Sequence, residues 1–282
     1  MLVREDGLFE GSISAGCLEG AVIVTAQDVA ASGVTTRIDF EPDDSLIWGT
    51  PSLCGGRVSV LVQPGTEENL AVDPAGRLIR LSDGSSFATG QSEPFDEAAA
   101  AKLATLAALR RPGLVSADYF FQIVSPLPRM LIIGGNHIAQ RLAELACVLE
   151  YGVVVVDPRR AFANSDRFPH AAISNLWPDE FLATFPADRQ TALVTLSHDT
   201  KIDDLALKEA LASPAFFIGA LGSRRTHAAR IDRLGKTGIS PASLARIEGP
   251  AGIDMNAAGP AEIALSILAG IVAAWRRDNP AR

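Results

Sequence analysis

Two cysteines in the first half stand in glycine-containing turns, where a thiol can react or bind a metal. Cys17 follows a Ser/Gly stretch and enters a helical pattern, and Cys54 stands in the turn at 53–56. The positive end of a helix favours a thiolate, and thiolates bind soft metals and carry sulfur. The two turns therefore predict a metal or sulfur-transfer site if they converge. The alternative is that both thiols are small buried hydrophobes.

A turn in the second half has the composition of a phosphate-binding turn. The run G-G-N-H-I-A at 134–139 follows an apolar strand and begins a helix. A dinucleotide fingerprint requires G-x-G-x-x-G/A here and an acid roughly 20 residues later. Asp157 supplies the acid, but Asn136 replaces the glycine that lets a pyrophosphate approach. The run predicts a phosphate-bearing ligand, a nicotinamide nucleotide, or a structural turn with Asn136 in a left-handed conformation.

Further polar segments follow predicted strands and reach the same sheet edge. The segment Ser-His-Asp at 197–199 cannot form a catalytic triad, because a triad needs side chains that converge from separate positions. Its residues either contact a ligand or cap the next helix. The glycines, serine and paired arginines of 219–225 suit a phosphate or carboxylate, or else a solvated helix start. His137 stands at the mouth of the first turn and either contacts an anion or packs as a cap.

The elements that would position these residues alternate regularly in the second half. Continuously apolar strands are predicted at 130–133, 153–156, 192–196 and 216–221, with helices at 137–150, 203–211 and 226–234. This alternation is typical of right-handed βαβ units. We expect an α/β fold with a Rossmann-type doubly wound parallel sheet over 129–282, closed by a buried helix at 263–275.

The first half has a mixed pattern. Strands are predicted at 34–40 and 57–62, a hairpin at 70–81 turning at 73–76, and helices at 17–31 and 97–110. Pro112 and Gly113 end the last helix, and a proline-containing connector follows at 125–128. We therefore expect a smaller α+β domain over 1–115 and a linker over 116–128.

Composition excludes several classes of protein. The net charge of −8 argues against a nucleic-acid partner, which requires a basic surface. The longest apolar stretch, 263–275, is too short to span a membrane, and the first seven residues lack the apolar segment of a secretory signal. Three cysteines without paired spacing predict no disulfide framework and a cytoplasmic location, with Cys147 in a helical core.

Together, these motifs resemble the XdhC/CoxI family of xanthine dehydrogenase accessory proteins. The resemblance runs in chain order over nearly the whole sequence. It rests on S-A-G-C-L-E at 14–19, C-G-G at 54–56, G-G-N-H at 134–137, D-P-R at 157–159, S-H-D at 197–199, G-A-L-G-S-R-R at 219–225, P-A-G-I-D at 250–254 and P-A-E-I-A-L-S-I-L-A at 260–269.

The resemblance implies a chaperone that binds molybdenum cofactor, assists its sulfuration by a cysteine desulfurase, and inserts it into a xanthine dehydrogenase-like or carbon monoxide dehydrogenase-like apoenzyme. It implies no catalytic residue and leaves a homodimer open. By position, Cys17 and Cys54 would contact the molybdenum. The cofactor-binding residues would be these two cysteines with Glu19, Gly134, Gly135, Asn136, His137, Asp157, His198, Gly222, Ser223 and Arg224.

The chain departs from the family pattern at Ala15, Asn136 and Gly270, and it begins at a point that the family reaches only after an earlier segment. We therefore expect an N-terminally truncated first domain. Two other functions stay open. One is an NAD(P)-dependent oxidoreductase, or another nucleotide-binding Rossmann protein, with Asp157 on a ribose hydroxyl. The other is a protein that has lost its ligand and only contacts a partner enzyme.

Overall fold

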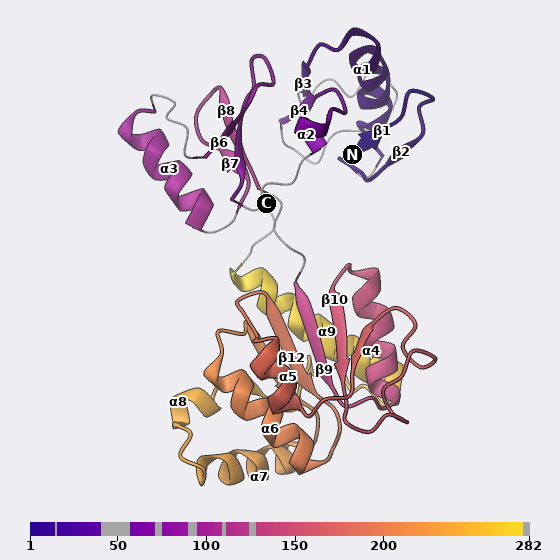
Figure 1. Ribbon diagram of the computed structural model, residues 1–282, viewed down its shortest axis with the longest axis vertical. Coiled ribbons are helices and arrows are strands. Elements are labelled where there is room, and N and C mark those ends of the chain that lie inside the picture. The colour runs from indigo at the N-terminus through magenta and orange to yellow at the C-terminus, as the bar shows by residue number, and fades with distance from the viewer. Residues whose placement is uncertain are drawn as a thin grey trace. The chain divides into compact units, whose positions relative to one another are not determined.

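The computed structural model divides the chain into two compact units, Met1–Ser125 and Pro126–Arg282 (Figure 1). It describes residues 1–14, 16–40, 57–70, 75–89, 95–108, 111–123 and 128–278. No helix in these ranges is long and apolar enough to cross a membrane.

The second unit is built on a six-stranded parallel sheet, which confirms the predicted Rossmann-type fold. The strands lie in the order β11-β10-β9-β12-β13-β14. Their bounds are β9 Arg129–Ile133, β10 Gly152–Val156, β11 Ala172–Ser174, β12 Thr191–Thr195, β13 Phe217–Ala220 and β14 Ile247–Glu248. The chain changes direction across the sheet between β9 and β12, and ligands of such sheets bind at this switch point.

Helices cover both faces of this sheet (Figure 1). Alternate side chains of β9 serve the two faces: Met130 and Ile132 pack with α4 and α9, and Leu131 and Ile133 pack with α5 and α6. The helices are α4 His137–Val148, α5 Pro178–Thr184, α6 Thr200–Ala212, α7 Arg224–Gly235, α8 Pro241–Leu244 and α9 Pro260–Asp278. The buried closing helix predicted at 263–275 forms the central part of α9.

The first unit is mixed α+β, and all of its strand pairs are antiparallel. Pairs β1-β2 and β3-β4 stand apart from a four-stranded sheet in the order β6-β5-β8-β7. The bounds are β1 Leu2–Val3, β2 Phe9–Glu10, α1 Glu19–Ser32, β3 Thr36–Phe40, β4 Val58–Val62, α2 Glu67–Leu70, β5 Arg77–Arg80, β6 Ser86–Ala88, α3 Glu97–Ala108, β7 Gly113–Leu114 and β8 Tyr119–Gln122.

Two expectations for the first half differ from the structure. The hairpin predicted at 70–81 is wrong, because Leu70 ends the short helix α2 and β5 pairs instead with β6 and β8. The range 116–128, expected as a linker, contains β8, whose Phe121 is fully buried. Both differences come from the pairing of β5 with β8, a contact between distant segments that local sequence patterns do not report.

Candidate functional site

The turn between β9 and α4 is packed tightly at the switch point. Gly134 has a φ of +100°, and a Cβ atom there would lie 2.6 Å from the backbone of Ser197. A Cβ atom on Gly135 would overlap the carbonyl oxygen of Phe162. Only glycine fits at either position, because the turn is enclosed by the segment after β12 on one side and by the loop after β10 on the other.

Asn136 joins the two strands of the switch point. Its φ of −78° is not left-handed, so the predicted left-handed conformation is wrong. It is the N-cap of α4: its Oδ1 accepts from the Ala139 N–H at 2.9 Å, and its Nδ2 donates to the Leu196 carbonyl at 2.7 Å. The N–H groups of His137 and Ile138 have no acceptor within the described ranges. The positive end of α4 therefore still offers donors to an anion.

Asp157 is fully buried and supports this turn from beneath. It accepts from the Gly135 N–H at 2.9 Å and from the Arg159 guanidinium at 2.8 Å on each oxygen. Burial raises the pKa of Asp157, but the hydrogen bonds from Arg159 and Gly135 outweigh it and hold the pKa below its usual value. Its oxygens are thus engaged and shielded from solvent, which argues against a contact to a ribose hydroxyl.

The loop after β10 folds across the same turn, and sequence reasoning did not select its residues. The Arg159 guanidinium lies 4.1 Å from the ring centre of Phe162, which is partly exposed. Arg167 donates to the Gly135 carbonyl at 2.9 Å and to Gln140 at 3.3 Å. The D-P-R motif at 157–159 was the available signal for Arg159. Nothing local marked Phe162 or Arg167, since their role depends on the fold of the loop.

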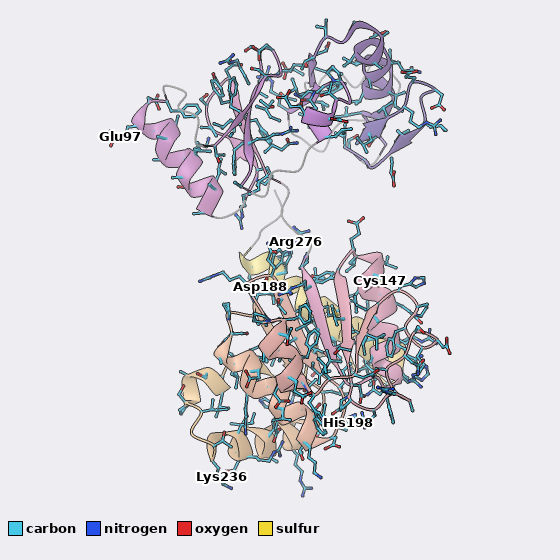
Figure 2. The ribbon with its side chains drawn as sticks, in the orientation of Figure 1. Glu97, Cys147, Asp188, His198, Lys236 and Arg276 are labelled. Atoms are coloured by element: carbon cyan, nitrogen blue, oxygen red, sulfur yellow. The ribbon has the colours of Figure 1, made fainter. Side chains whose placement is uncertain are left out.

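The Ser-His-Asp segment after β12 forms a strained turn at the carboxyl edge of the sheet. His198 is exposed there, with a φ of +61° (Figure 2). Ser197 Oγ donates to Asp203 at 2.6 Å and accepts from the Asp199 N–H at 3.0 Å. Asp199 caps α6 by accepting from the Lys201 N–H at 2.9 Å. The segment is therefore a helix cap that presents His198, and its three side chains form no triad.

The segment at 219–225 forms the start of α7. Gly222 has a φ of +136°, and Ser223 caps the helix by accepting from the Thr226 N–H at 3.2 Å. Arg224 is highly exposed, and its guanidinium lies 3.8 Å from Asp254. The Leu221 N–H donates to the Thr195 carbonyl at 2.9 Å, which ties this segment to the end of β12. The turns bearing Asn136, His198 and Ser223 thus end three adjacent strands.

In the first unit, Glu19 organises the loop that carries Cys17. Cys17 is exposed just before α1, whereas Glu19 is buried. Hydroxyl and backbone N–H groups of the loop donate to both carboxylate oxygens at 2.7–3.1 Å, from Ser12, Ile13, Ser14, Gly16 and Leu18. These bonds, led by those from Ser14, Ser12 and Ile13, hold the pKa of Glu19 well below its usual range. Glu19 therefore shapes the loop.

The second thiol of the predicted pair, Cys54, lies outside the described residues, as does the turn at 53–56. The predicted convergence of Cys17 and Cys54 thus stays a prediction. Cys147, expected in a core, is partly exposed, and its Sγ donates to the His170 carbonyl at 3.3 Å. Within the ranges that the structure covers, no cluster of three metal-binding side chains is present.

Comparison with known proteins identifies related sequences over nearly the whole chain. A protein of Bacillus subtilis (strain 168) named as a probable xanthine dehydrogenase subunit is 26% identical, covering 98% of this chain and 88% of its own length. The molybdenum cofactor insertion chaperone PaoD of Escherichia coli (strain K12) is 29% identical, covering 96% of this chain and 76% of its own. The crystal structure of a xanthine dehydrogenase from Bacillus halodurans superimposes with a TM-score of 0.74 at 24% identity, over 98% of this chain and 85% of that one, which shows a shared fold.

Family models agree with these relatives in both units. The model of the XdhC Rossmann domain matches residues 130–271, and the model of the XdhC and CoxI family matches residues 1–41. The first match contains the turn at Asn136, the strained His198 and the start of α7. The second contains the loop of Cys17. Because the Rossmann match alone spans half of the sequence, the chain belongs to the XdhC and CoxI family, as its motifs predicted.

Proposed function

We propose that this protein binds molybdenum cofactor, assists its sulfuration, and inserts it into a molybdenum hydroxylase of the xanthine dehydrogenase or carbon monoxide dehydrogenase type. Two relatives support the proposal by their names, which describe a molybdenum cofactor insertion chaperone and a probable component of xanthine dehydrogenase. The structural observation that carries it is the start of α4, where the N–H groups of His137 and Ile138 have no acceptor among the described residues.

The cofactor's phosphate would bind at the start of α4. This place combines a helix dipole, free N–H donors and the exposed imidazoles of His137 and His198. Gly222, Ser223 and Arg224 lie at the end of a strand next to β12 and would add a second group of donors. Gly134, Gly135, Asn136 and Asp157 would hold the turn in shape. These donors suit a phosphate, since they offer backbone N–H groups and the guanidinium of Arg224.

The metal-carrying end of the cofactor would contact Cys17, with Cys54 as the second thiol. Cys17 is exposed just before α1, so that its sulfur is accessible to a ligand. Glu19 fixes the shape of its loop, so that the thiol is presented on an ordered segment. The expected partners are the apo-hydroxylase and a cysteine desulfurase. A cytoplasmic location and a homodimer stay predictions from the sequence.

The test is to purify the protein from cells that make molybdenum cofactor and to measure bound molybdenum and released pterin. We expect both in the wild type, and PaoD prepared in parallel serves as the positive control. The variant C17S should retain pterin but lose molybdenum, and H137A/H198A should lose both. C147S, which changes a thiol in another part of the fold, is the matched control and should behave as the wild type. Neither molybdenum nor pterin in the wild type, with PaoD positive, would refute the proposal.

A further inference from the structure

Asp203, in the first turn of α6, is a buried carboxylate behind the candidate site. Its Oδ1 accepts from Ser197 Oγ at 2.6 Å and from the Ser197 N–H at 3.3 Å. Burying a carboxylate is unfavourable unless it is well bonded, and burial raises the pKa of Asp203 despite the bonds from Ser197. Because this burial is unfavourable, the presence of the carboxylate indicates that its bonds to the turn at 197–199 have a structural or functional role.

The turn that Asp203 supports contains the strained His198. A φ of +61° is disfavoured for a residue with a Cβ atom, and such strain persists only where the surroundings enforce it. Here the Ser197 hydroxyl enforces it from inside, because it joins Asp203 to the Asp199 N–H. The result is that the imidazole of His198 stands exposed at the edge of the sheet (Figure 2).

Basic side chains from three elements interact with the charge of Asp203. Arg230 of α7 is buried, donates to the Leu221 carbonyl at 2.8 Å, and leaves its Nε and Nη1 without an acceptor in the described part of the chain. Arg159 of the loop after β10 and His198 itself also interact with the Asp203 charge. Asp203 thus bonds directly to the turn after β12 and interacts electrostatically with the loop after β10 and with the middle of α7.

We propose that Asp203 is a positioning residue, which holds the turn at 197–199 through Ser197 and thereby keeps His198 left-handed at the mouth of the switch point. The functional part of this inference rests on the proposed function, in which His198 contacts the phosphate of the cofactor. The conformational part rests on the bonds and the φ angle alone, so the two parts can be tested separately.

The conformational test compares H198G with H198A, two variants that both lack the imidazole. In a left-handed turn glycine is favoured over alanine, whereas with a negative φ it is disfavoured. In urea unfolding of the full chain, we expect H198G to be more stable than H198A by about fivefold in the unfolding equilibrium constant. Combined with D203A, which removes the acceptor of both bonds from Ser197, the order should reverse, because the turn is then free to relax.

The matched control is D204A, on the same helix. Asp204 accepts from Arg233 at 2.6 and 2.8 Å and makes no bond to Ser197, so the order of H198G and H198A should be unchanged in this background. Should D203A prevent folding, S197A removes the same link through the hydroxyl and should also reverse the order. An unchanged order in D203A, or in S197A where D203A does not fold, would overturn the proposal.

The functional test measures the pterin retained by the same proteins. D203A should lower it about tenfold, as H198A does, and D203A/H198A should fall no further, because both changes remove one contact. D204A should retain the wild-type amount. A wild type without pterin would count against the proposed function alone, since the stability comparison still tests the role of Asp203. Full retention by D203A beside a depleted H198A would overturn the positioning role.

Discussion

Two buried carboxylates, one in each unit, hold the two candidate turns in different ways. Glu19 is bonded only to hydroxyl and backbone N–H groups of the loop at 12–18 in the described structure, whereas Asp157 is bonded to a backbone N–H and to the guanidinium of Arg159. Both were predicted from the sequence as ligand contacts. An acid beside a candidate turn can therefore shape the turn and leave the ligand contacts to neighbouring residues.

The largest loss of stability is expected when the ion pair between Asp157 and Arg159 in the second unit is broken. D157N leaves the Arg159 guanidinium without its carboxylate and weakens the bond to the Gly135 N–H. Removing one partner of a buried ion pair typically costs 3–5 kcal/mol, and the partial exposure of Arg159 places the expected loss near the lower end, about 3 kcal/mol. Urea unfolding measures it. D166N, at an exposed position, is the control, and equal stabilities for the two variants would contradict the anchoring role.

The next effect tests the tight packing of the glycine turn. G135A adds a methyl group that overlaps the Phe162 carbonyl, so the loop after β10 must move. Such overpacking costs about 2 kcal/mol in the free energy of unfolding. The matched change is G238A, since Gly238 has open space around it but a φ of +90°, so that its cost is backbone strain alone. G135A should expose the Arg159–Phe162 loop to proteolysis and G238A should not.

A smaller loss of stability is expected when the N-cap of α4 is removed. N136A removes the acceptor for the Ala139 N–H and the donor to the Leu196 carbonyl. Loss of an N-cap lowers the free energy of unfolding by about 1 kcal/mol, which urea unfolding measures.

The same variant tests the nicotinamide alternative. N136A should show no saturable binding of NADH in a fluorescence titration, because Asp157 remains bonded to Arg159 and Gly135. Tight NADH binding by the wild type or by N136A would favour the alternative function of a nicotinamide nucleotide-binding protein.

The stability that Glu19 contributes to the first unit should decrease in acid. The pKa of Glu19 is lowered, so the folded protein binds a proton there less readily than the unfolded chain. The stabilisation is therefore present above the usual carboxyl pKa of about 4 and is lost as the pH falls through the lowered value. The wild type should exceed E19Q in its urea midpoint at pH 7, and the difference should shrink toward pH 3. E10Q, at an exposed strand residue, should show no such change.

Local patterns predicted much of this molecule. The four central strands of the second unit and the helices α4, α6, α7 and α9 followed from apolar runs and their spacing, because parallel strands buried on both faces leave a clear pattern. The short elements β11, α5, α8 and β14 were not predicted. The β5–β8 pairing was missed, because it joins segments far apart in the sequence. The sequence also placed Asn136 and His198 at the site, yet it could not show that Asn136 is a cap, that Asp157 is engaged, or that Asp203 lies beneath His198. Those roles depend on bonds between separate elements.

Hydrogen–deuterium exchange of the protein with and without molybdenum cofactor tests the central claim most directly. A phosphate at the start of α4 should accept from the N–H groups of His137 and Ile138, so the peptide that spans the turn at 134–139 should exchange more slowly in the loaded protein. Protein that carries molybdenum and pterin but shows unchanged exchange in this peptide would contradict the claim that the switch point holds the cofactor.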